Sequence, residues 1–192
     1  MKYIKLVFVN LFVFLVLIIF LELFLNLFRT ESRSIKLKEL PVLKKSALTP
    51  NEDYLKYTDG LDPEKTSFLT DSEGYLITNN TSVKSPKKAN IIFYGGSSTE
   101  CIYVNEYKRF PQLIQDNLQQ INDSIIVLNS GVSGKTSILS TLDFISKGLK
   151  KNPEIVFFMH NINDLVLLLN SGSYWDAPET RSVINQKKKS SF

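Results

Sequence analysis

The sequence of 192 residues contains a single cysteine, Cys101, and a single histidine, His160. One cysteine excludes an intrachain disulfide and leaves the redox compartment undetermined. One histidine and one cysteine among scattered carboxylates give no ligand spacing typical of a metal site, so no metal and no other cofactor is expected. The scarcity of histidine also bears on catalysis, because histidine is the side chain that most often serves as a general base.

Charge of either sign is limited as well. The 23 lysine and arginine residues exceed the 19 aspartate and glutamate residues by only four. The excess basic residues lie mostly near the two ends and form no stripe, so no nucleic-acid partner is expected. A solvated surface or contact with anionic lipid headgroups accounts for them. With 43% hydrophobic residues, the chain is long enough for one folded domain but not for two.

The one long hydrophobic run extends from Leu6 to Phe28. Some 20 residues of helix cross the hydrocarbon core of a bilayer, so this run is long enough to span it. No small-residue cleavage site precedes Arg29, which favours an uncleaved single-pass anchor over residues 1–29, with membrane lipid as its partner. Glu22 is costly against lipid, and we expect it near a membrane interface or against a partner helix.

The run is followed by a polar and basic stretch, residues 30–88, which we expect to be a juxtamembrane connector. Its turn signals include Asp59-Gly60 and Asp62-Pro63, and an ordered lead-in is expected at Asp71-Ser72-Glu73-Gly74-Tyr75. The basic residues that follow the span are Arg29, Arg33, Lys36, Lys38, Lys44 and Lys45. By the positive-inside rule, these residues would place the rest of the chain in the cytoplasm.

Residues 89–192 begin with a regular pattern that predicts an α/β domain with a parallel sheet. Three apolar runs have the length of strands, and two segments between them have helical spacing of apolar residues. The expected strands are Ile91–Tyr94, Ile125–Leu128 and Ile155–Met159, and the expected helices are Phe110–Ile121 and Thr136–Leu149. The unbroken apolar strands indicate a sheet covered on both faces. No further strand is predicted in residues 171–192, which include Lys187-Lys188-Lys189 and have no assigned role.

Each predicted strand is followed by residues suited to acyl chemistry. The first ends in Gly95-Gly96-Ser97, the second runs into Asn129-Ser130-Gly131-Val132-Ser133-Gly134, and the third precedes Asn163-Asp164. Parallel strands end at one edge of their sheet, so a serine hydroxyl, a glycine N–H and an asparagine amide would converge there as a nucleophile and an oxyanion hole. Asparagine and glycine are also common turn formers, which leaves plain strand-to-helix connections as the alternative.

The ordered set of three loops resembles the SGNH/GDSL hydrolases, in particular a membrane-anchored branch of that family. The resemblance covers Asp71 to Leu165 and the anchor, and it implies a three-layer, flavodoxin-like α/β/α domain. It makes Ser97 the nucleophile and Gly131 and Asn163 the oxyanion donors. The supporting residues that it implies are Gly95, Gly96, Asn129 and Gly134, with Asp164 fixing the third loop. The sequence has Gly96 where the family has aspartate, and Asn161 where it has glycine.

What the resemblance implies about activity is the hydrolysis or transfer of an acyl ester, for example an acetyl group on a glycan, at the outer face of a membrane. The basic residues that follow the span favour the opposite location, in the cytoplasm. The family's Asp-x-x-His block, which supplies the base, has no counterpart here, and His160 does not occupy the base position. We therefore expect an incomplete domain, either with a second chain supplying the base or with a non-catalytic interaction role.

A phosphate-binding loop is a further alternative. Gly134-Lys135-Thr136 follows a predicted strand and opens a predicted helix, as the end of a P-loop does. Asn129 stands where that motif requires a glycine, and the next strand, Ile155–Met159, ends without an aspartate for magnesium. In the hydrolase interpretation Lys135 is expected to be a surface residue early in its helix.

The anchor can be tested without knowledge of any activity. Alkaline carbonate strips peripheral proteins from membranes but leaves spanning helices in place. We expect the full chain to remain in the membrane pellet after carbonate extraction, as detected by immunoblot, and recovery in the supernatant would contradict a spanning helix. A variant with two charges in the middle of the run, Leu15→Arg with Ile18→Arg, serves as the control that should no longer be retained.

Overall fold

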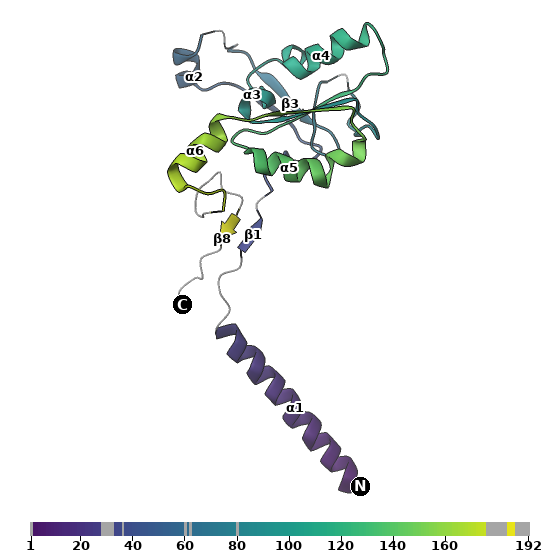
Figure 1. The fold of residues 1–192 in the computed structure, drawn as a ribbon, viewed down its shortest axis with the longest axis vertical. Coiled ribbons are helices and arrows are strands. Elements are labelled where there is room, and N and C mark those ends of the chain that lie inside the picture. Colours follow the sequence, from purple (N-terminus) through teal and green to yellow (C-terminus); the bar gives the residue numbers. More distant parts are fainter. Residues whose placement is uncertain are drawn as a thin grey trace. The chain divides into compact units, whose positions relative to one another are not determined.

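The structure, a computed structural model, describes residues 2–27, 33–35, 37–59, 61, 63–79, 81–175 and 184–186. It contains two compact units, Met1–Ser34 with Gln186–Phe192, and Ile35–Asn185 (Figure 1). The positions named above that lie outside the described residues are Phe28, Arg29, Lys36, Gly60, Asp62 and Lys187-Lys188-Lys189. Within 171–192, where no strand was predicted, a three-residue strand β8 (Ile184–Gln186) pairs with β1 (Arg33–Ile35).

The first unit contains the long helix α1 (Lys2–Leu27). Its segment Tyr3–Leu25 has a mean hydropathy of 3.0 and none of it is buried by the rest of the chain. At a rise of about 1.5 Å per residue, its 23 residues reach across the hydrocarbon core of a bilayer. The prediction of an N-terminal helix that is long and apolar enough to cross a membrane is confirmed.

The second unit is built on a mixed sheet of six strands in the order β2-β3-β4-β6-β5-β7. Their bounds are β2 Lys45–Leu48, β3 Thr66–Thr70, β4 Leu76–Ile77, β5 Ile91–Gly95, β6 Val127–Gly131 and β7 Ile155–Met159. The strands β6, β5 and β7 run parallel, as predicted, and β5 lies between the other two. The strands β2, β3 and β4 add an antiparallel half, so the sheet is mixed.

The antiparallel half comes from the range that the sequence analysis assigned to a connector. Its strands are short, and buried Thr66 and Thr70 occupy positions where apolar residues would have marked a strand. Both hydroxyls have backbone acceptors, since Thr66 Oγ1 donates to Ile102 O at 2.7 Å and Thr70 Oγ1 to Pro41 O at 2.6 Å. The ordered lead-in is the turn between β3 and β4, where Asp71 Oδ1 accepts from the N–H groups of Glu73 and Tyr75.

The strand β6 begins and ends later than the predicted Ile125–Leu128. Asn129 and Ser130 look like loop residues in the sequence because they are polar. In the structure both are buried in the strand and paired, with Asn129 Nδ2 donating to Thr99 O at 2.9 Å and Ser130 Oγ to Asp143 Oδ2 at 2.9 Å. These internal partners remove the cost of burying polar side chains, so the strand continues to Gly131.

The helices flank the sheet. Figure 1 shows α4 (Phe110–Gln119) and α5 (Ser137–Ser146) on opposite sides of it. Both were predicted, although α5 gives way to a 3₁₀ turn, η2 (Gly148–Lys151), before Leu149. The helix α6 (Ile162–Ser171) was not predicted, and α2 (Glu52–Tyr57), α3 (Ser97–Glu100) and η1 (Glu106–Lys108) are too short to show a period.

The core contains two buried clusters. One comprises Tyr75, Ala89, Ile92, Tyr94 and Leu128, and the other Leu40, Phe68, Leu76 and Val132. The two clusters draw on both halves of the sheet, so the antiparallel strands bury part of the same hydrophobic surface as the parallel ones. Stacked rings extend the packing across the parallel strands, with Phe93 on Phe157 at 4.8 Å and Tyr94 on Phe158 at 5.4 Å between centroids.

A buried ion pair lies beneath the loop that connects β6 to α5. The prediction that Lys135 is a surface residue is wrong, because its side chain is fully buried. Its Nζ lies 2.5 Å from Asp143 Oδ2, and Lys147 Nζ lies 3.2 Å from Asp143 Oδ1. Burial lowers the pKa of Lys135, and Asp143 opposes that effect by stabilising the charged form. The sequence does not indicate that Lys135 pairs with Asp143, which lies two turns further along in α5.

Removal of the lysine charge should strongly destabilise the domain. Lys135→Met keeps most of the side-chain volume but leaves Asp143 buried without its nearest cation, which costs about 3–5 kcal/mol at such sites. We expect a corresponding loss in the free energy of unfolding, measured by urea denaturation of the detergent-solubilised chain.

Two control variants separate charge pairing from a general loss of lysine. The exposed Lys150→Met should change stability by less than 1 kcal/mol. The double variant Lys135→Met with Asp143→Leu should recover most of the loss, because an apolar pair replaces the buried ions. If the double variant were as unstable as the single one, the ion pair would not be the cause.

Candidate active site

The strand β5 ends in two buried glycines, and α3 begins directly after them at Ser97. A Cβ on Gly96 would lie 2.6 Å from Asn163 Nδ2, so a larger residue here would displace the Asn163 amide. Ser97 itself is exposed. As the first residue of α3, its N–H has no acceptor within the helix, and its hydroxyl makes no hydrogen bond to a described residue. The strand end thus presents a free hydroxyl and a free N–H together.

Asn163 reaches this point from the first turn of α6. Its side chain is buried, and its Nδ2 donates one hydrogen bond to Lys135 O at 3.0 Å. An amide nitrogen carries two hydrogens, so the second remains for another acceptor. These contacts bring the first and third predicted loops together at Gly96 and Asn163, and they join both to Lys135, the residue directly after the second predicted loop. Ser97 follows Gly96 in the chain, whereas Gly131 makes its hydrogen bond elsewhere.

Gly131 and Gly134, the two glycines of the second loop, differ in their surroundings. The Gly131 N–H already donates to Asn129 Oδ1 at 2.9 Å, and a Cβ on Gly131 would lie 2.9 Å from Glu100 Cα in α3. Gly134 has a φ of +71°, in the left-handed region, and its N–H donates to no described group. The N–H of Gly131 is therefore occupied beneath α3, whereas that of Gly134 is available in the loop.

Asp164 holds the third loop against the start of α5. It accepts hydrogen bonds from Ser137 N at 2.9 Å, from the Ser137 hydroxyl at 2.5 Å and from the Tyr174 hydroxyl at 2.8 Å. Burial alone would raise the pKa of Asp164, but these hydrogen bonds, together with nearby His160, outweigh burial and lower it. The carboxylate is thus a fixed acceptor between two loops, in line with a structural role.

His160 lies at the end of β7 in a buried position. Its Nδ1 is 3.9 Å from Asp164 Oδ2, beyond hydrogen-bond distance, and neither ring nitrogen has a hydrogen-bond partner among the described residues. Burial lowers its pKa more than Asp164 raises it, which favours the neutral imidazole. His160 makes no contact that would let it take a proton from Ser97, and it is the only histidine of the chain.

An open groove of about 590 Å³ lies beside Ser97. Its lining is uncharged and consists of Tyr54, Leu61, Ser97, Ser98, Cys101, Ile102, Tyr103, Val104 and Ser133. The rings of Tyr54 and Tyr103 stand 5.6 Å apart. Sequence reasoning missed the groove because Tyr54 and Leu61 come from the expected connector. The cluster Tyr54-Leu55-Lys56-Tyr57 was the only local signal, since paired tyrosines are unusual in a linker.

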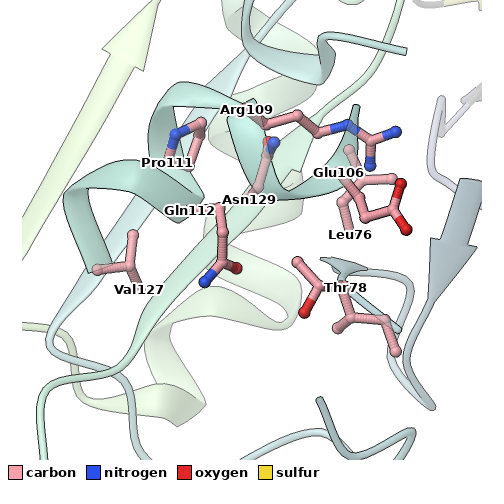
Figure 2. Close-up of a pocket in the computed structure, with 9 residues that line it drawn as sticks. Leu76, Thr78, Glu106, Arg109, Pro111, Gln112, Val127 and Asn129 are labelled. Atoms are coloured by element: carbon pink, nitrogen blue, oxygen red, sulfur yellow. The ribbon is translucent and has the colours of Figure 1, made fainter. Parts of the chain in front are cut away.

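A second cavity is too small for a substrate. Figure 2 shows it between α4 and the strands β4 and β6, with the side chains of Glu106, Arg109 and Asn129 around it. Its volume of about 20 Å³ matches a single water molecule. Arg109 links two segments here, since its guanidinium donates to Ser67 O at 2.6 Å and to Cys101 O at 3.1 Å. This contact ties the groove wall to β3.

Two other kinds of site find little support. The part of the chain that the structure describes contains no group of three histidine, cysteine, aspartate or glutamate residues placed to hold a metal ion. The lysine that a phosphate-binding loop would use, Lys135, has its ammonium group bound to Asp143 in the core. A phosphate at this loop would therefore meet backbone N–H groups but not that ammonium.

The role of Asp164 predicts a pH-dependent loss of stability in Asp164→Asn. A carboxyl with a lowered folded-state pKa contributes stability above its ordinary pKa, and that contribution is lost as the pH falls through the folded-state value. The variant should therefore be less stable than the parent at pH 7, and the difference should shrink as the pH is lowered below 4. Thermal melts from pH 7 to pH 3 measure this, and a difference independent of pH would contradict it.

Comparison with known proteins leaves this site to be interpreted from its own geometry. No family model matches the chain, and no curated protein matches it. What the structure shows is an α/β domain with a mixed sheet, in which Ser97 follows β5 beside an uncharged groove and the Asn163 side chain lies next to Gly96 and Lys135.

Proposed function

We propose that the chain is a membrane-anchored SGNH/GDSL-type serine hydrolase or transferase that acts on acyl esters. One observation carries the proposal. The exposed Ser97 lies directly after β5 and Gly96, and a Cβ on Gly96 would come within 2.6 Å of the Asn163 amide nitrogen. A nucleophile next to a buried amide with a spare hydrogen is the arrangement that acyl transfer requires. The parallel strands with helices on both sides are compatible with the flavodoxin-like order of that family.

In the proposed reaction, Ser97 Oγ attacks the carbonyl carbon of the ester and loses its proton to a base. The carbonyl oxygen becomes an oxyanion, which accepts hydrogen bonds from the Ser97 N–H and from Asn163 Nδ2. For the third donor we favour Gly134 over Gly131, because the N–H of Gly131 is occupied by Asn129. The alcohol leaves with the proton from the base. Water then releases the acyl group from Ser97, or a second alcohol accepts it in a transfer.

The base comes from a second chain in this proposal. His160 is buried and neutral, without a contact to Ser97, and the chain has no other histidine. The groove beside Ser97 is open, so a partner can place a side chain over the hydroxyl from the solvent side. Without such a base a serine is a weak nucleophile. Activity is therefore expected only where that partner is present.

The groove indicates what kind of ester fits. Its lining carries no charge, and aromatic and aliphatic side chains make up most of it. A neutral ester therefore binds without leaving a charge unpaired. A phosphate or carboxylate group would lose its hydration water, and no cation of the groove would compensate for that loss. Rings such as Tyr54 and Tyr103 accommodate either a sugar face or an acyl chain. We propose an acylated glycan at the extracytoplasmic face of the membrane, with α1 as the single-pass anchor.

A non-catalytic interaction module is the second candidate. The observation in its favour is the state of Ser97, whose hydroxyl has no hydrogen-bond partner among the described residues and therefore no base to activate it. The two candidates differ in a measurable way, because an enzyme reacts at Ser97 and a module does not.

Reaction at Ser97 is tested with a fluorophosphonate probe and with p-nitrophenyl acetate, on membranes of the native cell that contain any partner chain. Ser97→Ala should abolish the labelling. It should also reduce hydrolysis to the rate seen in membranes without the protein. Asn163→Ala should lower the rate by about 10²–10³, the usual cost of one oxyanion donor.

Ser124→Ala, also an exposed serine but outside the groove, is the control and should keep full activity. Thermal melts should show that Asn163→Ala still folds. If the parent chain folds but is never labelled, the result supports the non-catalytic interaction module and contradicts the enzyme. Labelling that persists in Asn163→Ala at the parental rate would remove Asn163 from the site.

A further inference from the structure

The turn that carries Gly134 is held at almost every backbone group. Val132 N donates to Gly95 O at 3.0 Å, and Lys135 N donates to Val132 O at 3.0 Å. Lys135 O in turn accepts the Asn163 amide. Of the four N–H groups from Val132 to Lys135, that of Gly134 is the one without an acceptor among the described residues. The turn therefore leaves a single donor available and fixes the residues on either side of it.

This turn has the features of a type II turn. Its ends are joined by the hydrogen bond from Lys135 N to Val132 O, and Gly134 at the third position has a φ of +71°. Ser133, at the second position, does not have a positive φ. A type II turn needs a positive φ at its third position, which glycine adopts without strain. The central peptide of a type I turn points the opposite way, so the turn type sets the direction of the Gly134 N–H.

Glu100 binds the second residue of the turn through two hydrogen bonds. Its Oε2 accepts from Ser133 N at 2.7 Å and also from the Ser133 hydroxyl. The Glu100 side chain is buried, so water does not compete for these bonds. Without the carboxylate, the Ser133 N–H would lose its acceptor, and the turn would exchange with other conformations.

Glu100 belongs to the same short helix as the proposed nucleophile. Helix α3 begins at Ser97 and ends at Glu100. The helix is also fixed to β6, since Asn129 Nδ2 donates to Thr99 O at 2.9 Å. One element thus carries the attacking hydroxyl at its start and, at its end, the acceptor that holds the turn. The position of the Gly134 N–H relative to that hydroxyl therefore depends on Glu100.

We propose that Glu100 is a positioning residue, which holds the turn so that the Gly134 N–H is directed at the oxyanion formed at Ser97. This role rests on the proposed function, and it names the residue that orders the third donor of that site. An oxyanion donor has to be in place before the reaction, because reorganisation in the transition state lowers the rate. Glu100 itself does not contact the substrate in this role, since its side chain is buried and does not line the groove.

The role requires an acceptor and not a negative charge. Burial raises the pKa of Glu100, even though Ser133, Arg109 and Lys38 favour the carboxylate form. A glutamine has the same length, and its amide oxygen can accept both bonds from Ser133. Glu100→Gln should therefore keep the turn, whereas Glu100→Ala removes the acceptor. In this respect a positioning residue differs from a general base, which glutamine cannot replace.

The test is hydrolysis of p-nitrophenyl acetate by membranes of the native cell, with active sites counted by the fluorophosphonate probe. Glu100→Ala should lower kcat by about 10- to 100-fold and leave KM within about twofold, because the donor acts in the transition state. Glu100→Gln should stay within about threefold of the parent. Glu106→Ala is the matched control. It removes another buried carboxylate, which accepts from Asn79 at 2.7 Å, and it should keep the parental kcat per active site.

A proline at position 133 provides an independent rescue. Proline is favoured at the second position of a type II turn, and it has no N–H that needs an acceptor. Ser133→Pro combined with Glu100→Ala should therefore hold the turn without the carboxylate and recover most of the lost kcat. If Glu100 took part in the chemistry, the double variant would remain as slow as Glu100→Ala, and the positioning role would be wrong.

Amide hydrogen exchange of the detergent-solubilised chain reports on the turn without any activity. Glu100→Ala should speed exchange in peptides that cover Val132 to Lys135 by about tenfold or more, and Glu100→Gln should not. Faster exchange in Glu100→Ala with the parental kcat would make Glu100 a structural residue only. A Glu100→Gln variant as slow as Glu100→Ala would also overturn the proposal. A parent chain that is neither labelled nor active contradicts the proposed function itself, and the positioning role is then wrong as well.

Discussion

The arrangement of the domain depends most on Lys135, which is bonded through both its side chain and its backbone. Its ammonium group is 2.5 Å from Asp143 in the core, and its carbonyl accepts the Asn163 amide at 3.0 Å. A charge can remain in the interior only with a close partner of opposite sign, so the position of Lys135 is fixed by Asp143 and not by the loop. The loop between β6 and α5 is therefore anchored from below, and through its carbonyl it positions the third loop. Asp164 completes the connection by accepting hydrogen bonds from Ser137 at the start of α5.

These contacts hold one side of the candidate site, while the other side is open. Asn163 Nδ2 donates to Lys135 O, and Asp164 accepts hydrogen bonds from Ser137. The groove along Tyr54 and Tyr103 is open to solvent and uncharged. The single histidine of the chain lies at the end of β7, and its ring nitrogens are buried without a hydrogen-bond partner among the described residues. The proposed reaction therefore depends on a base from another chain.

The sequence by itself determined the features that depend on neighbouring residues. These are the apolar helix α1, the three parallel strands, two of the helices, and the glycines that let β5 deliver Ser97, because hydrophobic period and glycine geometry are local properties. Tertiary structure decided the rest. Contacts between segments distant in the chain made strands of Thr66–Thr70 and Leu76–Ile77, buried Lys135 against Asp143, occupied the N–H of Gly131 and left that of Gly134 available. The groove beside Ser97 likewise depends on Tyr54, which no local pattern connects to the serine. For the buried threonines, Lys135 and the Gly131 N–H, a polar group gained a partner that only the folded chain brings within reach, and the free energy of that pairing does not appear in any short window of sequence.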